Sequence, residues 1–309
     1  MLPVGNRSGI PCGPFYDFYS GYTYWESEYS YWTGGTPVPL SAAQMLARFA
    51  VMKANNQRMI VGLSGVSSGF RTDGYFDLAK WKAKIDAVDA VGIDSYVADG
   101  TVWAHYIIDE PKSPNSWGGV CIPNNILDEM AAYSKGYWPT LPCVVRHEPL
   151  YLINRASASC GAWPGGDYQW EALDGAWLQY TTYKAAVAGG PICGPYMAAN
   201  YASAQSQGLS LVAGCNWRDG GDGSSGVASE LWVGKWTMSP TEISTYSNIL
   251  LSDSYPDVSA WMMWRYVFNT TTEPNGSAYW VSAPMRAAFA DLMDLCAARE
   301  RRPMLRRLI

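Results

Sequence analysis

The sequence lacks several features that mark common functional classes. No apolar run approaches the roughly 18 residues that a membrane span needs, so we expect no membrane partner. The seven cysteines form no CxxC pair, so the usual zinc and thioredoxin-like motifs are absent. No GxGxxG follows a candidate strand, which leaves a dinucleotide-binding fold without support. We therefore expect neither a metal site nor a cofactor.

Charge is also scarce. Only 16% of the 309 residues are charged, and 22 basic against 27 acidic residues give a formal net charge of -5. No basic face of the kind that follows a phosphate backbone is apparent, so nucleic acid is not an expected partner. Arginines do gather in residues 299–309, which we interpret as a frayed basic tail.

Apolar and aromatic residues are plentiful. The chain is 48% hydrophobic, which is enough to bury a sizeable core, and it holds 15 tryptophans and 21 tyrosines. The N-terminal MLPVGNRSG has no signal-peptide pattern. Low charge and loops rich in Gly, Ser, Asn and Thr nevertheless favour a secreted or periplasmic protein, in which Cys121 and Cys160 could form a disulfide.

Short apolar runs alternate with amphipathic segments along the whole chain. This alternation predicts βα units and a parallel sheet. The candidate strands are residues 14–19, 58–63, 102–108, 141–146, 173–180, 209–216 and 258–264, and the helices between them 76–88, 123–135, 196–207 and 283–298. We expect a single α/β domain over residues 1–298, a (β/α)8 TIM barrel. Its eighth strand is either residues 277–281 or an N-terminal segment.

Two further helices are predicted by their first residues. Ser41 opens SAAQ and Ser239 opens SPTE, and each is a capping box that satisfies free backbone amides at a helix start. Apolar residues follow both boxes at helical spacing, as a helix packed on a sheet requires.

Polar and aromatic residues stand where the candidate strands end. Barrel enzymes place their chemistry at the carboxyl ends of strands, so we expect these residues to share one rim. They are Asp109 and Glu110 after the third candidate strand, Arg146, His147 and Glu148 after the fourth, Tyr180 after the fifth, Asn216, Trp217, Arg218 and Asp219 after the sixth, and Trp264, Arg265 and Tyr266 after the seventh.

Two of these carboxylates, Glu110 and Glu148, directly precede a proline. Proline favours an extended residue before it, so each Glu should finish its strand with its side chain over the barrel mouth. Glycoside hydrolysis needs one protonated carboxyl group and one ionised carboxylate. Glu110 with Glu148, or Glu110 with Asp219, could supply the pair, unless these carboxylates are paired to Arg146 and Arg218.

Aromatic residues in predicted loops point the same way. Rings that stack on the C–H faces of sugars would line a polysaccharide groove, and large exposed apolar areas usually have a binding purpose. The alternative is that some of these rings fill long loops against the barrel. The tryptophans concerned are Trp25, Trp32, Trp117, Trp163, Trp217, Trp232, Trp236 and Trp280.

The motifs IIDEP at 107–111, RHEP at 146–149 and WMMWRY at 261–266 resemble those of TIM-barrel glycoside hydrolases. Over most of residues 75–298, the segments ADGTVWAHYIIDEP, LDGAWLQY, QGLSLVAGCNWRDGG and MSPTEISTYSNILLSD are also similar to a group of bacterial barrel proteins that we expect to be exported.

The resemblance implies roles for individual residues. In the glycosidase clan with its acid/base on strand four, a Glu-Pro after a strand is the proton donor, which matches Glu110 first and Glu148 second. The clan's nucleophile ends strand seven, where this sequence has Trp264-Arg265-Tyr266 and no carboxylate. Either the second carboxylate is then Asp109, Asp174 or Asp219, or the site is not that of a retaining glycosidase. Arg146, Arg218 and Arg265 would orient the substrate or tune the carboxylates.

Three other interpretations stay open. A carbohydrate-binding barrel without catalysis would keep the aromatic rim and need no carboxylate pair. A serine hydrolase would use Ser67 in Gly65-Val66-Ser67-Ser68-Gly69, a GxSxG match after a strand. Asp219 and Asp222 in DGGDGSSG could bind Ca²⁺, although the spacing differs from an EF-hand loop.

Overall fold

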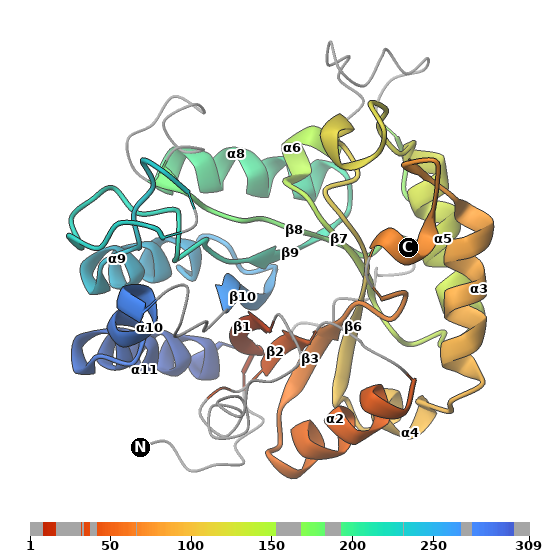
Figure 1. The fold of residues 1–309 in the computed structure, drawn as a ribbon, viewed down its shortest axis with the longest axis horizontal. Helices are drawn as coiled ribbons and strands as arrows, with labels where there is room; N and C mark the ends of the chain where they lie inside the picture. Colours follow the sequence, from red (N-terminus) through yellow and green to blue (C-terminus); the bar gives the residue numbers. More distant parts are fainter. Residues whose placement is uncertain are drawn as a thin grey trace.

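Eight parallel strands form the centre of the molecule (Figure 1). The structure, a computed structural model, describes residues 9–16, 32, 34–37, 42–65, 67–152, 168–182, 193–230, 232–266 and 274–299. Within them the pairing order is β1-β10-β9-β8-β7-β6-β3-β2, and β1 pairs with both β10 and β2, so the sheet curls and closes. The strands are β1 (Cys12–Tyr16), β2 (Gly34–Pro37), β3 (Arg58–Val61), β6 (Val102–Asp109), β7 (Cys143–Arg146), β8 (Gly175–Trp177), β9 (Ser210–Ala213) and β10 (Val258–Tyr266).

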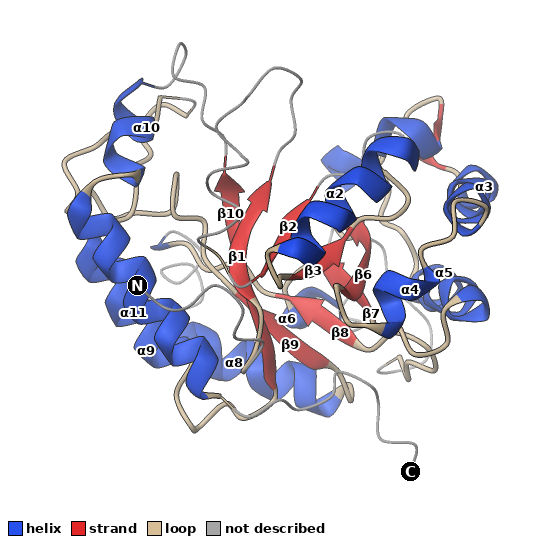
Figure 2. Cartoon of the chain, turned by 90° about the horizontal axis from the view of Figure 1, so that it is seen from below, coloured by secondary structure: helices blue, strands red, loops and turns tan. Residues whose placement is uncertain are grey.

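Helices surround this sheet. Figure 2 shows α8, α9 and α11 along one side of the strands and α2 to α5 along the other. The helices are α2 (Ala42–Ala54), α3 (Leu78–Asp89), α4 (Asp94–Ala98), α5 (Asn124–Tyr137), α6 (Pro149–Leu152), α8 (Cys193–Ser206), α9 (Pro240–Leu250), α10 (Pro274–Trp280) and α11 (Ala283–Ala298). None of the helices in the described part of the chain has the length and hydropathy of a membrane span.

The seven candidate strands are confirmed, and the eighth comes from the N-terminal part of the chain. It is β2, a short strand of sequence GGTP. The alternative at residues 277–281 is wrong, because the backbone of 274–280 forms α10. The regular eightfold βα repeat stays a prediction, since residues 17–31 between β1 and β2 lie outside the described ones. A single domain over residues 1–298 likewise stays a prediction.

The extra strand changes the count along the barrel. With β1, β2 and β3 as the first three strands, β6 is the fourth strand, β7 the fifth, β9 the seventh and β10 the eighth. Each polar strand end after residue 100 therefore moves up by one position. This matters for the site, because the expected roles depend on the strand number.

The inside of the barrel is filled by side chains and is not a channel. Ile60, Val144, Val212 and Met262 come from four different strands and are completely buried together with Trp177. Such packing is typical of parallel barrels, whose strands are covered on both faces. The interior therefore acts as a rigid base for whatever stands at the strand ends.

The capping box at Ser239 is confirmed. The Ser239 hydroxyl accepts a hydrogen bond from the Glu242 amide, and the Glu242 carboxylate accepts one from the Ser239 amide at 2.7 Å. Helix α9 begins at Pro240, as the box predicts. Ser41, the other predicted cap, lies outside the described residues, although α2 begins at Ala42.

Most of the described loop tryptophans are buried, which corrects the picture of a broad aromatic rim. Trp32, Trp217 and Trp280 join Phe289 in one cluster, where the Trp217 and Trp280 ring centroids are 4.0 Å apart. Trp117 is equally buried, while Trp232 and Trp236 remain exposed. Trp25 and Trp163 lie outside the described residues. Half of the eight tryptophans that we expected in loops thus fill space between loops and helices.

Among the described cysteines, one is part of a disulfide. Cys121 is in a disulfide, whereas Cys12, Cys143, Cys193, Cys215 and Cys296 are buried free thiols. The remaining cysteine, Cys160, lies outside the described residues. Disulfides persist mainly in oxidising compartments.

The first residue of the predicted tail is held by the fold. The Arg299 guanidinium donates to the carbonyl oxygens of Leu251 at 2.6 Å and Ser252 at 3.3 Å, just past the end of α9. A cation at a helix C-terminus satisfies carbonyls that have no partner within the helix. Residues 300–309 lie outside the described ones.

His105 on β6 is a structural residue rather than a catalytic one. Its ring stacks on Trp81, and Nδ1 lies 2.8 Å from the Ser134 hydroxyl. Burial lowers its pKa to about 3, whereas an unfolded histidine titrates near 6.5. Below pH 6.5 the unfolded chain therefore binds a proton that the folded chain does not, and stability falls as the pH falls toward 3.

We expect this effect to appear in His105→Gln. Between pH 6.5 and pH 5 the wild-type chain should lose about 2 kcal/mol more unfolding free energy than the variant, because glutamine does not titrate. Urea denaturation at both pH values measures the difference. Equal losses in the two proteins would contradict the assignment of a neutral, buried His105.

Candidate functional site

An ion pair stands at the carboxyl ends of β6 and β7. Arg146 ends β7, and its Nε donates to Asp109 Oδ1 at 2.5 Å while its Nη2 donates to Oδ2. The Arg146 side chain is 6% exposed and that of Asp109 is 38% exposed. Arg146 is therefore the buried partner of the pair, and Asp109 is the partner that solvent reaches. A two-point contact between guanidinium and carboxylate is the strongest and most directional form of ion pair.

Aromatic rings enclose the Arg146 guanidinium. It lies 3.7 Å from the centroid of the Trp264 ring and 5.7 Å from that of Trp177. Burial opposes its charge, but Asp109, with smaller contributions from Tyr106 and Glu110, outweighs this, so the Arg146 pKa is raised. Arg146 is therefore a fixed cation with a fixed orientation.

Tyr106 completes this group from inside the barrel. Its ring meets Trp177 edge to face at 5.8 Å. Burial, and after it the charge of Asp109, raises the pKa of Tyr106 well above its ordinary value. The hydroxyl therefore stays protonated and can donate to a carboxylate at the mouth.

Glu110 has an unusual backbone conformation. Its φ is +42°, in the left-handed region, so the expectation of an extended residue before Pro111 is wrong. Three hydrogen bonds hold it there. Its amide donates to the Arg146 carbonyl at 2.9 Å, and its carbonyl accepts from the Ser113 amide at 2.9 Å and from Trp117 Nε1 at 3.0 Å.

This conformation costs about 1–2 kcal/mol for a residue with a Cβ atom. The surrounding contacts stabilise it enough to persist, and the Glu110 side chain is left exposed at the end of the fourth strand. Its negative charge is close enough to contribute to the raised pKa of Arg146. Glu110, Asp109 and Arg146 thus lie together.

Glu148 has a different environment. It is 5% exposed, and the Tyr196 hydroxyl from α8 lies 3.3 Å from its Oε1 and 3.2 Å from the carbonyl oxygen of Gln179. Burial, and next the charge of Glu148, raises the pKa of Tyr196, so this hydroxyl remains a donor. Glu148 is packed between the fifth strand and α8, whereas Glu110 is open to solvent.

The seventh strand, β9, is followed by Asp219. Its Oδ1 accepts a 2.6 Å hydrogen bond from the Ser229 hydroxyl, and its amide lies 3.3 Å from Asn216 Oδ1. Asp219 is half-buried. We expected the seventh strand to end at Trp264 without a carboxylate, and this is wrong. In the structure the seventh strand is β9, and the segment after it contains Asp219, whereas Trp264 belongs to the eighth strand, β10.

The remaining predicted site residues divide by burial. Tyr180 is completely buried and packs on Tyr196 and Tyr246 between the barrel and its helices, and Trp217 is buried against Trp280. Arg218 is 3% exposed. His147 is half-buried, and its ring meets Tyr151 at 5.6 Å. The side chains of Arg265 and Tyr266 lie outside the described part of the chain.

Asp174, suggested above as a second carboxylate, is at the opposite end of the barrel. It directly precedes β8, and its side chain is fully buried. It accepts hydrogen bonds from the Lys135 ammonium and the Cys143 amide, both at 2.8 Å. This location is wrong for a residue of the mouth, and the contacts are those of a structural ion pair.

Ser67 does not have the surroundings of a nucleophilic serine. It lies in a 3-10 helix, Ser67–Phe70, and its hydroxyl accepts a 3.2 Å hydrogen bond from Arg71. A nucleophile elbow instead needs a strand that turns directly into a helix, and a histidine base. His105 lies against Trp81 and the Ser134 hydroxyl, and the His147 ring meets Tyr151, so the structure gives Ser67 no support as a nucleophile.

The DGGDGSSG loop is held by the cap of α9. The Glu242 carboxylate accepts from the Asp222 amide at 3.0 Å and from the Ser224 hydroxyl at 3.2 Å. Among the described residues no group of three or more His, Cys, Asp or Glu side chains could hold a metal ion. These contacts explain the order of the loop without Ca²⁺.

Lys112 was not among the expected site residues. It follows Pro111, and its Nζ donates to the Ile122 carbonyl at 2.7 Å. Burial lowers its pKa to about 7. Sequence gives no signal for this, because the burial comes from the loop that returns over Lys112. Lys112 is therefore a buried amine of lowered pKa, two residues after Glu110 in the chain.

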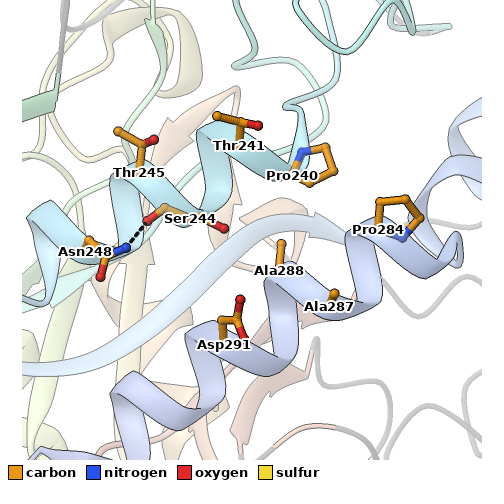
Figure 3. A pocket seen from close by; sticks show the side chains of 9 residues that line it. All are labelled: Pro240, Thr241, Ser244, Thr245, Asn248, Pro284, Ala287, Ala288 and Asp291. Atoms are coloured by element: carbon orange, nitrogen blue, oxygen red, sulfur yellow. Dashed lines mark hydrogen bonds between the residues drawn. The ribbon is translucent and has the colours of Figure 1, made fainter.

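A groove of about 370 Å³ lies away from the strand ends (Figure 3). It runs on the outer wall between α9 and α11, and its lining is small and weakly polar. Asn248 donates within it to the carbonyl oxygen of Ser244 at 2.8 Å. It contains no pair of carboxylates, so the candidate site is the mouth and not this groove.

No protein-family model and no curated protein sequence matches the chain. Solved structures do. The xylanase 10B of Thermotoga petrophila RKU-1, in complex with xylobiose, has a TM-score of 0.57 and 10% identity over 93% of this chain and 94% of that one. The xylanase 10B of Thermotoga maritima has a TM-score of 0.55 and 10% identity over 93% of this chain and 95% of the other.

A larger enzyme shows the same likeness. The β-D-glucuronidase of Dictyoglomus thermophilum has a TM-score of 0.55 and 9% identity over 97% of this chain and 52% of that one. TM-scores of 0.55 to 0.57 show a shared fold, and identities of 9–10% leave the chemistry open. In fold, the chain is similar to the TIM-barrel glycoside hydrolases.

Proposed function

We propose that this protein is a glycoside hydrolase with a complete (β/α)8 barrel, which cleaves an oligo- or polysaccharide by carboxylate acid/base catalysis. The observation that carries the proposal is Glu110. Three hydrogen bonds hold this glutamate in the left-handed region at the end of the fourth strand. Its backbone is therefore strained at the place where barrel enzymes have their catalytic residues.

The positions of the strands in the barrel support the choice of the two catalytic carboxylates. Glu110 on the fourth strand takes the position that the clan reserves for its proton donor, and Asp219 follows the seventh strand, where the clan has its nucleophile. We assign Glu110 as proton donor and Asp219 as the second carboxylate. Glu148 is the alternative donor, and its burial beside Tyr196 makes it the weaker one.

Asp109 and Arg146 support this pair. Because Arg146 is fixed between Asp109 and Trp264, it presents a constant positive potential to Glu110. Asn216, His147 and Trp264 are half-buried at the same strand ends and can contact sugar hydroxyls or ring faces. Secretion or a periplasmic location fits the disulfide at Cys121, so the substrate would be an extracellular glycan.

A carbohydrate-binding barrel without catalysis is the second candidate. The observation that favours it is the pairing of Asp109 with Arg146, which commits one mouth carboxylate to a structural contact. Glycan binding alone needs the rings and hydrogen-bond donors of the mouth and no carboxylate pair.

Asp219→Asn separates the two functions. Aryl glycosides and soluble polysaccharides, with released reducing ends as the readout, should be hydrolysed by the wild-type chain, and we expect kcat to fall about 10²–10⁴-fold in the variant. Asp222→Asn is the matched control, because Asp222 lies in the same loop and its Oδ1 accepts from the Ser224 amide. Full activity in Asp219→Asn would refute the assignment, and glycan binding without any hydrolysis would establish the binding barrel.

A further inference from the structure

The exposed large hydrophobic side chains of the described chain share one location. Along the chain each follows the carboxyl end of a barrel strand and precedes the next long helix, with Tyr151 in the short helix α6 and Val281 between α10 and α11. They are Tyr75 after β3, Val120 after β6, Tyr151 after β7, Trp232, Val233 and Trp236 after β9, and Val281 after α10. Exposed apolar area concentrated on one face marks an interaction surface.

Three of these residues form a single feature, the aromatic turn of residues 232–236. Trp232 is 43% exposed, Val233 104% and Trp236 37%. The Lys235 amide donates to the Trp232 carbonyl at 3.1 Å, and Gly234 has a φ of +76°, so the chain reverses directly beside Val233. The most exposed apolar group of the loop therefore lies at its tip.

Hydrogen bonds hold the base of this turn. The Ser229 amide donates to the Lys235 carbonyl at 2.8 Å, and the Gly221 amide donates to the Trp236 carbonyl at 2.9 Å. A Cβ atom on Gly221 would lie 2.4 Å from the Thr237 carbonyl oxygen, so only glycine fits there. The glycines of the DGGDG segment thus allow its backbone to pack against the turn, which presents its rings in a fixed place.

The turn is connected to the proposed catalytic carboxylate. The Ser229 hydroxyl donates to Asp219 Oδ1 at 2.6 Å and accepts from the Trp232 amide at 3.2 Å. Glu230 from the same loop accepts a 3.1 Å hydrogen bond from the Asn275 amide of α10. Hydrogen bonds therefore join the turn with the exposed rings to Asp219 and to α10.

We propose that the aromatic turn is a subsite for a polysaccharide chain that extends out of the mouth over β9. This rests on the proposed function and specifies its substrate class, a polymer rather than a small glycoside. Flat rings with polar neighbours suit the alternating C–H faces and hydroxyls of a sugar chain, and the fixed backbone reduces the entropy lost on binding.

The test compares ring chemistry at one position. Trp232→Tyr keeps a ring and Trp232→Leu keeps only apolar area. In gels that contain xylan, hydroxyethylcellulose or mixed-linkage β-glucan, we expect one of these polymers to slow the wild-type chain and Trp232→Tyr, and to slow Trp232→Leu on the order of tenfold less. Tyr133→Ala, on the outer wall, is the control and should migrate as the wild-type chain does.

A second readout is the ratio of kcat/KM for the polymer to that for an aryl glycoside, which should fall about tenfold in Trp232→Leu. A purely structural role would lower both values together and leave the ratio unchanged.

Equal retardation of Trp232→Leu and the wild-type chain overturns the proposal. So does a wild-type dimer on size-exclusion chromatography that Trp232→Leu converts to monomer without any change in retardation, because the turn would then bind a second copy of the chain. Retardation that depends on Trp232 without hydrolysis would refute the catalytic assignment and leave the subsite in place.

Discussion

Replacing Glu110 with glutamine should lower hydrolysis by about 10²–10⁴-fold and leave the fold intact. The amide has nearly the shape of the carboxyl group but no proton to give to the leaving oxygen. The three hydrogen bonds that fix residue 110 involve its backbone, so the exposed side chain can change without disturbing them. Steady-state kinetics with one aryl glycoside and one polysaccharide, together with a thermal unfolding curve, measure both parts.

The loss should depend on the leaving group. An aryl glycoside that releases a dinitrophenolate needs little help from an acid, whereas a sugar leaving group needs nearly a full proton. We therefore expect Glu110→Gln to retain much more of its activity on the activated substrate. Equal losses on both substrates would show that Glu110 is not the proton donor.

Glycine at the same position tests the strain. Glu110→Gly removes the Cβ clash of the left-handed conformation, so we expect the variant to be inactive and up to about 1 kcal/mol more stable. Asp73→Gly is the matched control, because Asp73 has a φ of +51° in the exposed β4–β5 turn, between Arg71–Thr72 and Tyr75–Phe76. It should gain similar stability and keep full activity. A stabilised and inactive Glu110→Gly would show strain that is retained for function.

The sequence predicted the strands that carry apolar runs, but it left the eighth strand open between residues 277–281 and an N-terminal segment. Strand β2 reads GGTP, with no alternation and a proline at its end. It becomes a strand because its neighbours approach closely: a Cβ atom on Gly34 would lie 2.5 Å from the Arg58 carbonyl oxygen. That contact is tertiary, and no local pattern encodes it. One strand without a definite place was enough to shift the strand count by one, so Asp219 was assigned to the sixth strand instead of the seventh.

Side-chain burial was the second property that could not be predicted from the sequence. Glu110 and Glu148 look alike in sequence, since each follows a strand and precedes a proline, yet one is exposed and the other is buried against α8. The helix that covers Glu148 lies about fifty residues further along the chain, at Tyr196. The tryptophans in loops behave in the same way. Ring type and loop position indicated a sugar rim, and long-range packing decided which rings remained exposed.

Asp174 should matter for stability and not for catalysis. Asp174→Ala leaves the Lys135 ammonium and the Cys143 amide without their acceptor in a site where the Asp174 side chain is fully buried. Removing one partner of a buried pair costs about 3–5 kcal/mol, because the other charge stays desolvated. Urea denaturation measures this cost, and kcat per folded molecule should equal that of the wild-type chain.

The exposed pair between Lys82 and Glu129 gives the control. Its side chains are 29% and 46% exposed, so Glu129→Ala should cost no more than about 1 kcal/mol. A loss below 1 kcal/mol in Asp174→Ala would mean that water reaches the buried site and replaces the carboxylate. A tenfold fall in kcat of the folded variant would instead connect the amino end of the barrel to the mouth. The expected result assigns the two ends separate tasks: Asp174 stabilises β7 and β8 from below, and those strands hold Arg146 and Trp177 in place beneath the carboxylates.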